Sequence, residues 1–159
     1  NWMYGALRIR RAPGFLDHYP LGGMGIGTPL AVGAAAAARE LAGGGAARRV
    51  VLVTGDGSFG FYPAELHAAA HAGLPLVVVV CNDGAWGTEY HGQRAAIGRA
   101  VNTELGALPY EHAGIAFGGS GIRVERLAEL GPALDEAFAM AKPCVVNVLV
   151  DREAGAALK

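Results

Sequence analysis

The sequence predicts an α/β fold with a central parallel sheet and helices on both faces. Three short apolar runs, at 50–53, 76–81 and 144–150, lack the polar alternation of half-exposed strands and are typical of strands covered on both sides. Helical patterns separate these runs, and strands alternating with helices at this spacing indicate a parallel sheet. With 159 residues, 52% of them hydrophobic, the chain is long enough for one domain with a sizeable core.

The first part of the chain leads into a helix. Residues 1–20 hold prolines and glycines among aromatics and arginines, and we expect them to form an irregular lead-in. The glycine-rich segment 22–27 predicts a turn, and the Ala, Leu and Val residues that dominate 28–41 predict a buried helix. The three consecutive glycines at 43–45 are expected to end that helix.

Strands and helices then alternate to the end of the domain. The expected order is a strand at 50–53, a helix at 63–72, a strand at 76–81, a short helix after 85, a helix at 110–117, a weak strand at 122–124, an amphipathic helix at 125–140 and a strand at 144–150. No repeat or long linker interrupts the series. We therefore expect one domain over 21–151, followed by a C-terminal tail at 152–159.

Composition excludes several classes of protein. A net charge of −1 argues against a nucleic-acid-binding protein, which usually has a strongly basic face. The longest apolar stretches, 30–38 and 74–81, are far shorter than the roughly 20 residues of a membrane helix. Cys81 and Cys144 lie in apolar runs and are expected to be buried free thiols, which favours a cytoplasmic location. Because the chain begins with Asn1, we expect a fragment of a larger multidomain enzyme.

Glycine and acidic or amide residues follow two of the predicted strands, at 55–58 and 82–85. In an open parallel sheet, ligands bind beyond the carboxyl ends of the strands. The glycines let the backbone approach an anion closely, and backbone amides before the next helix can hold phosphate oxygens. Asp56 and the second loop offer the hard oxygen ligands that Mg²⁺ shares with bound phosphate. Each short motif alone is a common turn, but together they predict a magnesium–diphosphate site.

Three segments resemble one family of enzymes. The segment GDGSFGFYPAELHAAAHAGLPLVVVVCNDGAWG, at 55–87, resembles the thiamine diphosphate signature of the acetolactate synthase, benzoylformate decarboxylase and pyruvate decarboxylase family. LGGMGIGTPLAVGAAAA, at 21–37, resembles the glycine turn and helix of that family, and 122–150 resembles its last helix and strand. The resemblance covers roughly residues 20–150 and implies the thiamine diphosphate-binding fold.

The resemblance implies roles for individual residues. Asp56 corresponds to the first metal ligand. Asp83, which lies 27 positions later, corresponds to the second. Ala85 corresponds to the position whose backbone carbonyl completes the set of protein ligands. Gly22 corresponds to the residue whose carbonyl holds the amine of the aminopyrimidine, and Met24 to the apolar wedge that bends the cofactor. The expected cofactor-binding residues are Gly22, Gly23, Met24, Gly55, Asp56, Gly57, Ser58, Asp83, Ala85, Trp86 and Gly87.

The second metal ligand departs from the family pattern. The family usually has Asn-Asn or Asp-Asn before the glycine, whereas this chain has Asn82 followed by Asp83. The spacing favours Asp83. The alternative ligand is Asn82, which would need a local bulge or twist because neighbouring strand residues point to opposite sides.

The resemblance implies thiamine diphosphate and Mg²⁺ as cofactors of an acetolactate synthase-like transferase or lyase. Such an enzyme makes or breaks a C–C bond next to the carbonyl of a 2-oxo acid, with the cofactor as the electron sink. Decarboxylation of a 2-oxo acid or an oxalyl-CoA-type substrate is the alternative.

The activating glutamate of the family lies on a separate pyrimidine-binding domain that has no match here, so we expect no catalytic residue in this chain and no activity of the chain alone. We expect that domain, in the same or a partner chain, to be the binding partner of this one, and the full-length protein to form a homo-oligomer. We expect neither nucleic acid nor a membrane as a partner.

Other patterns have two interpretations. The metal loop is followed by Trp86, Glu89 and Tyr90, in a region that lines the substrate channel of the resembling family; the alternative interpretation is that they pack against a partner. His67 and His71 have zinc-ligand spacing, but the glutamate of the zincin motif is absent, which favours two partly buried structural histidines. Glu65 is expected to be structural. The glycine pattern at 23–27 lacks the strand and acidic residue of a dinucleotide site. A non-catalytic phosphate-binding module is the alternative of another class.

Overall fold

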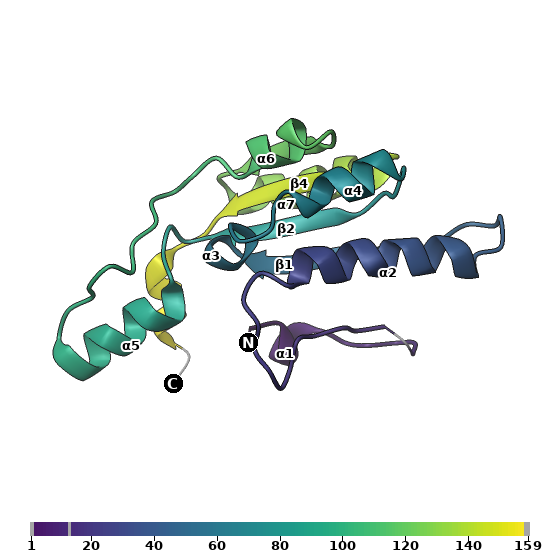
Figure 1. The fold of residues 1–159 in the computed structure, drawn as a ribbon. Coiled ribbons are helices and arrows are strands. Elements are labelled where there is room, and N and C mark those ends of the chain that lie inside the picture. Colours follow the sequence, from purple (N-terminus) through teal and green to yellow (C-terminus); the bar gives the residue numbers. More distant parts are fainter. Residues whose placement is uncertain (1, 13, 158–159) are drawn as a thin grey trace.

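The computed structural model describes residues 2–12 and 14–157 and contains one four-stranded parallel sheet (Figure 1). The strands are β1 (Val51–Gly55), β2 (Val77–Asn82), β3 (Ser120–Val124) and β4 (Cys144–Leu149). Their order across the sheet is β1-β2-β4-β3, so β2 and β4 lie in the centre. The predicted α/β class with a parallel sheet is confirmed.

Helices cover both faces of this sheet, as predicted, but unevenly. The helices are α1 (Trp2–Ala6), α2 (Gly27–Leu41), α3 (Asp56–Phe59), α4 (Glu65–His71), α5 (Gly87–Ile97), α6 (Glu111–Ala116), α7 (Leu127–Ala139) and the 3₁₀ helix η1 (Arg152–Ala157). On one face, α2, α3, α4 and α6 share a core that includes Phe59 and Leu66, whereas α7 covers the other face with Ala133 and Ala137. No helix in the described ranges is long and apolar enough to cross a membrane.

The register of the strands brings two loops together. Gly55, the last residue of β1, pairs with Cys81, the penultimate residue of β2. Asp56 and Asp83, each of which directly follows its strand, therefore lie at the same edge of the sheet, where ligands of such folds bind. Helices α5 and η1 also lie beyond the carboxyl ends of the strands, away from the body of the sheet (Figure 1).

Three short helices were not predicted. The lead-in is not wholly irregular because it contains α1, α3 begins immediately after β1, and η1 forms in the expected tail. Helices of one or two turns have too few residues to show a periodic apolar pattern, so the sequence gives little sign of them.

Helix α2 and strand β1 are more exposed than predicted. Only Thr28, Ala31 and Ala35 of α2 are buried, and Leu41 is 85% exposed. β1 forms an edge of the sheet, and its Val51 is 44% exposed because, within the described residues, only β2 pairs with this strand. The predictions of a buried helix and of a strand covered on both faces were wrong for these two elements, since both lie at the margin of the domain.

The two cysteines are free thiols, as predicted. Cys144 is buried between the sheet and α7, and burial raises the pKa of its thiol to about 11. Cys81 is only partly buried, near the edge of the sheet where the acidic loops meet.

Candidate functional site

The carboxylate of Asp56 is buried and joins the ends of two strands. Oδ1 accepts a hydrogen bond from the amide of Gly57 at 2.9 Å, and Oδ2 accepts one from the amide of Gly84 at 2.9 Å. Asp56 is 2% exposed because α3 starts at this residue and turns its side chain under the loop after β2. The amide of Gly57, predicted to be free for phosphate, is therefore occupied by Asp56 in this structure.

Burial and a second carboxylate perturb the proton affinity of Asp56. Desolvation raises its pKa from 3.8 to about 6, and the charge of Asp83 adds to the increase, against the effect of the two backbone hydrogen bonds. The pKa of the neighbouring Cys81 thiol is also raised, first by burial and then by the charges of Asp56 and Asp83. The structure thus brings together the two acidic residues that were predicted as metal ligands.

Asn82 and Asp83 have different environments. The Asn82 amide donates to the carbonyl of Leu108 at 2.9 Å and to Oδ1 of Asn147 at 3.1 Å, inside the domain. Asp83 Oδ1 accepts from the amide of Ala85 at 3.0 Å, and a Cβ on Gly87 would lie 2.7 Å from Asp83 Oδ2. A side chain at position 87 would therefore require this carboxylate to shift from its place at the start of α5.

The donor set fits a magnesium ion that is shared with a phosphate. In the described ranges, no lysine, arginine or histidine forms an ion pair with Asp56 or Asp83. The same residues contain no cluster of three His, Cys, Asp or Glu side chains that could enclose a metal. Mg²⁺ typically takes one or two carboxylates and completes its shell with phosphate and water, so two uncompensated carboxylates are a suitable protein contribution.

Ala85 lies in a short backbone bridge. It faces Glu104 in an isolated antiparallel bridge, whose hydrogen bonds run from the Trp86 amide to Thr103 at 2.8 Å and from the Leu105 amide to Gly84 at 2.8 Å. The Ala85 carbonyl takes no part in these two bonds and is not committed to the bridge. This environment is compatible with its predicted role as a backbone ligand.

The glycine turn docks onto the acidic loop through Ser58. The amide of Gly25 donates to Ser58 Oγ at 3.0 Å, so the predicted cradle residue also fixes the turn before α2. Leu21 is 93% exposed and Met24 is 46% exposed. Gly22 and Gly23 lie in the same turn, and Gly22 is exposed with φ of +64°.

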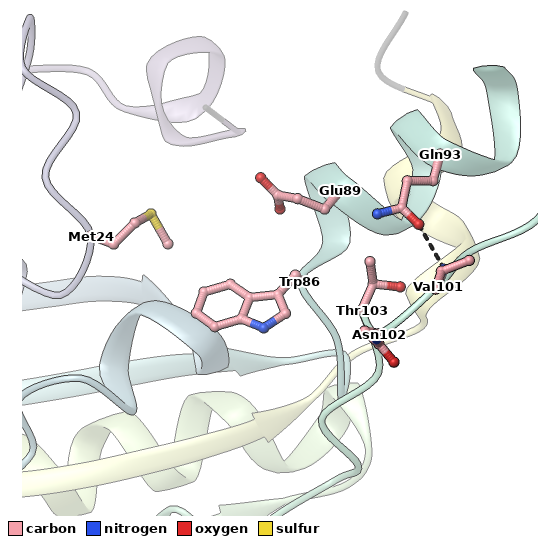
Figure 2. A pocket seen from close by; sticks show the side chains of 7 residues that line it. All are labelled: Met24, Trp86, Glu89, Gln93, Val101, Asn102 and Thr103. Atoms are coloured by element: carbon pink, nitrogen blue, oxygen red, sulfur yellow. Dashed lines mark hydrogen bonds between the residues drawn. The ribbon is translucent and has the colours of Figure 1, made fainter. Parts of the chain in front are cut away.

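A pocket with a volume of about 370 Å³ opens beside this turn (Figure 2). Met24 and Trp86 approach it from separate segments, and Glu89 and Gln93 reach it from α5. The Gln93 side chain accepts a hydrogen bond from the Val101 amide at 2.6 Å and so fixes the opposite wall. The lining residues are Met24, Trp86, Glu89, Gln93, Val101, Asn102 and Thr103.

Tyr90 does not line this pocket, unlike the other two candidates for the substrate channel. Its ring packs against the guanidinium groups of Arg94 and Arg152, whose carbon atoms Cζ are 5.2 and 5.0 Å from the ring centroid. The geometry therefore brings Trp86 and Glu89 together at the pocket and gives Tyr90 a packing role.

Trp86 also borders a second pocket, with a volume of about 260 Å³, next to the acidic loops. Its indole packs on Gly57 so closely that a Cβ there would lie 2.7 Å from two ring carbons. The lining residues are Gly57, Gly60, Phe61, Trp86, Leu105 and Tyr110. The indole is thus a common wall of the two pockets.

Sequence reasoning missed a buried polar chain behind the site. Asn147 is fully buried in the middle of β4, and its amide donates to Glu111 Oε2 at 2.6 Å. Arg123 lies 3.7 Å from the other oxygen of Glu111. An asparagine within the apolar run of β4 was the available signal, because a buried amide requires partners.

Sequence reasoning also missed Arg152, whose side chain contacts the loop after β2. Its Nε donates to the carbonyl of Asp83 at 3.0 Å and its Nη2 to the carbonyl of Gly84 at 3.1 Å. The sequence gives no signal for this contact, which depends on how η1 folds back after β4.

The histidine pair and Glu65 take no part in the site. His67 and His71 lie on α4 with ring centroids 6.1 Å apart, and both are exposed, so the expectation of partly buried histidines was wrong. Glu65 is exposed in the first turn of the same helix. The helix buries Leu66 and Ala69 instead, which leaves these three side chains in solvent.

Known proteins are similar to this chain along most of its length. The family model described as "Thiamine pyrophosphate enzyme, C-terminal TPP binding domain" matches residues 1–148. A probable acetolactate synthase of Mycobacterium bovis is 40% identical over 138 residues, which are 86% of this chain. A 2-hydroxyacyl-CoA lyase of Oryza sativa is 37% identical over 147 residues, with 89% of this chain covered.

A solved structure shows the same architecture. The benzoylformate decarboxylase from Polynucleobacter necessarius superimposes with a TM-score of 0.75 at 27% identity, over 83% of this chain and 24% of the decarboxylase. The chain likewise spans 24% of the length of the synthase and of the lyase. The similarity therefore concerns one domain of each of these proteins.

Proposed function

Because the chain belongs to the thiamine pyrophosphate enzyme family, as its C-terminal TPP-binding domain, we propose that it binds the diphosphate through Mg²⁺ at Asp56 and Asp83. The observation that carries this proposal is the pair of neighbouring carboxylates with no basic partner among the described residues. A divalent cation would neutralise both charges and remove the repulsion by Asp83 that, after burial, raises the pKa of Asp56.

The proposed ligands are the two carboxylates and the Ala85 carbonyl. Gly55, Gly57 and Ser58 would border the diphosphate, and Gly87 leaves space for Asp83. Met24 would support the bent cofactor, and the carbonyl of Gly22 would meet the aminopyrimidine. The Nδ2 of Asn82 donates to Leu108 and Asn147, and its Oδ1, the atom that would bind a metal, accepts from the Gly84 amide at 3.2 Å, which favours Asp83 as the second ligand.

The remaining half of the site would come from another domain. When bound, thiamine diphosphate supplies an electron sink for the carbon next to a carbonyl. The residues of this chain would orient it, exclude water through Trp86 and Met24, and neutralise the metal. We propose that a pyrimidine-binding domain, in the same or a partner chain, covers the exposed apolar surface at Leu21, Met24 and Phe61 and supplies the activating glutamate.

The proposed reaction is acetolactate synthase-like carboligation of a 2-oxo acid such as pyruvate. The similarity to a mycobacterial probable acetolactate synthase supports this choice. Glu89 and Trp86 would contact the substrate, since both line the larger pocket. We propose a homo-oligomer in the cytoplasm as the working form.

The test uses the full-length protein that contains this chain. Purified protein with thiamine diphosphate and Mg²⁺ is incubated with pyruvate, and acetolactate and CO₂ are measured. Asp56→Ala serves as the control that should lose Mg²⁺-dependent cofactor binding in calorimetry. Cofactor affinity of Asp56→Ala equal to that of the wild type would refute the metal assignment.

Cleavage of a 2-hydroxyacyl-CoA is the second candidate, because a lyase of this type is 37% identical to the chain. Decarboxylation of a 2-oxo acid or oxalyl-CoA-type substrate is a third outcome of the same assay. Product analysis with pyruvate, a 2-hydroxyacyl-CoA and oxalyl-CoA as separate substrates distinguishes these reactions. Absence of any turnover together with intact cofactor binding would instead favour a non-catalytic phosphate-binding module.

A further inference from the structure

Arg152 binds the two carbonyl groups that lie between the proposed metal ligands Asp83 and Ala85. Its Nε and Nη2 donate to the carbonyls of Asp83 and Gly84 at 3.0 and 3.1 Å. These carbonyls belong to the two peptide units that connect the α-carbons of residues 83 and 85. The planar guanidinium can hold both carbonyls at once, which a lysine ammonium on a single flexible stem cannot do with the same geometry.

Other contacts hold the guanidinium in place. Its Nη1 lies 3.3 Å from the Glu104 carboxylate, and its Cζ lies 5.0 Å from the centroid of the Tyr90 ring. The side chain is only 27% exposed. The His91 ring nitrogen Nε2 contacts the carbonyl of Arg152 at 2.9 Å, so helix α5 also fixes the backbone from which the arginine projects.

The carbonyl of Gly84 is bound from three directions. The amides of Leu105 and Gly106 donate to it at 2.8 and 3.0 Å, and Arg152 adds the third donor. On the other side of the same residue, the Gly84 amide donates to the Asp56 carboxylate. Because Gly84 has φ of +69°, its conformation differs from that of an ordinary strand residue and benefits from this fixation.

We propose that Arg152 is a positioning residue of the metal site, which holds the loop 83–85 so that its oxygen ligands are preorganised for Mg²⁺. The proposal rests on the proposed function of this loop. Arg152 itself does not face the metal, since its donors are committed to backbone carbonyls and Glu104. Partners that orient metal ligands in this way commonly change metal affinity by about 10- to 100-fold when they are removed.

The test measures metal binding directly in the full-length protein. Mg²⁺ is titrated by calorimetry at saturating thiamine diphosphate, and Mn²⁺ binding is followed by electron paramagnetic resonance. We expect Arg152→Ala to raise the Kd for Mg²⁺ by about tenfold or more. Millimolar guanidinium should restore part of the affinity in this variant, and Arg152→Lys should retain only part of it, because an ammonium cannot reproduce the fork.

Arg94→Ala is the matched control. Arg94 contacts the same Tyr90 ring and binds Glu153 of η1 at 2.7 Å, but it has no contact with the metal loop. Its replacement should leave the Kd for Mg²⁺ unchanged. Thermal unfolding of each variant verifies that the protein is folded, and hydrogen exchange of the Leu105 and Gly106 amides reports on the loop without any metal.

The outcomes separate the two proposals. Unchanged Mg²⁺ affinity in folded Arg152→Ala, or an equal loss in Arg94→Ala, would overturn the positioning role while leaving the proposed function intact. A wild-type protein that binds no thiamine diphosphate with Mg²⁺ would overturn the proposed function and this role together. A selective loss in Arg152→Ala that guanidinium reverses supports both.

Discussion

The carboxylate of Asp56 accepts a hydrogen bond from the backbone amide of Gly84 at 2.9 Å and so links the ends of β1 and β2. This link buries the carboxylate, and burial is the main reason why its pKa is raised to about 6. The two strand ends therefore share a group whose charge depends on pH in the weakly acidic range.

The first prediction concerns the pH dependence of Mg²⁺ binding. A proton on Asp56 competes with the metal, so the Kd for Mg²⁺ in the cofactor-free protein should rise as the pH falls below about 6. Well below that pH, the increase from this group should approach about tenfold per pH unit. Calorimetric titrations between pH 5 and 8 test this, and a Kd independent of pH over that range would contradict it.

The same shift has a consequence for stability. The pKa of Asp56 is raised from 3.8 to about 6, so the folded protein binds a proton that the unfolded chain releases. The contribution to stability is complete below pH 3.8 and is lost as the pH rises through about 6. This difference corresponds to about 3 kcal/mol. Added Mg²⁺ should offset the loss, and denaturant unfolding of the metal-free and metal-bound protein at pH 5 and 8 measures about half of the full difference, the part that is lost between these two pH values.

The second prediction distinguishes Asp83 from Asn82. Asp83→Asn removes one negative charge from the metal site, so Mg²⁺ binding to the empty site should weaken by about tenfold. Thiamine diphosphate binding at saturating Mg²⁺ should be equal or tighter, because the lost charge also repelled the diphosphate. Asn82→Ala should mainly lower the unfolding temperature, since the Asn82 amide bonds Leu108 and Asn147. The assignment is wrong if folded Asn82→Ala loses metal binding and Asp83→Asn does not.

The third prediction concerns the contact between Gly57 and Trp86. In Gly57→Ala the new methyl group would lie 2.7 Å from ring carbons of Trp86, so the indole must move into one of the two pockets. Thiamine diphosphate affinity should therefore fall by about tenfold or more, the size expected when tight packing at a site is disturbed. Gly33→Ala is the control, because nothing lies within 4 Å of a Cβ on this exposed residue of α2. It should leave affinity unchanged and stabilise the helix slightly.

The fourth prediction concerns the buried amide of Asn147. Asn147→Leu replaces the amide by a somewhat larger apolar group, so Glu111 loses its buried donor and Asn82 keeps only the Leu108 carbonyl as an acceptor for its Nδ2. We expect a loss of about 2–4 kcal/mol in the free energy of unfolding, because each unpaired buried group costs about 1–3 kcal/mol. Urea unfolding should show a lower midpoint with an unchanged slope. Val146→Ala, a neighbour that removes packing but no hydrogen bond, provides the comparison.

The fifth prediction concerns the 159-residue chain by itself. It should not turn over pyruvate with thiamine diphosphate and Mg²⁺, because the activating glutamate and half of the cofactor pocket are expected elsewhere. The exposed Leu21 and Met24 should also promote self-association, which sedimentation measures. Decarboxylation of pyruvate by the purified chain would contradict this expectation.

The sequence was sufficient to predict the sheet and the acidic strand ends, because both depend on local patterns. Uninterrupted valines indicate a buried strand, and the parallel arrangement then brings Asp56 and Asp83 to one edge. The sequence did not reveal the exposure of β1, which depends on the order of the strands. Arg152 and Glu111 were also missed, since their partners are 69 and 36 residues away in the chain and become neighbours only in the folded domain.

Trp86 gives the protein an optical signal at the place where binding is proposed. The sequence contains one other tryptophan, Trp2, so a Trp2→Phe variant would have a single indole, located in the wall between the two pockets. Indole fluorescence depends on the polarity and the quenching groups around the ring. Occupation of either pocket would change the emission of this one residue, and ligands could then be compared by titration in solution without a label.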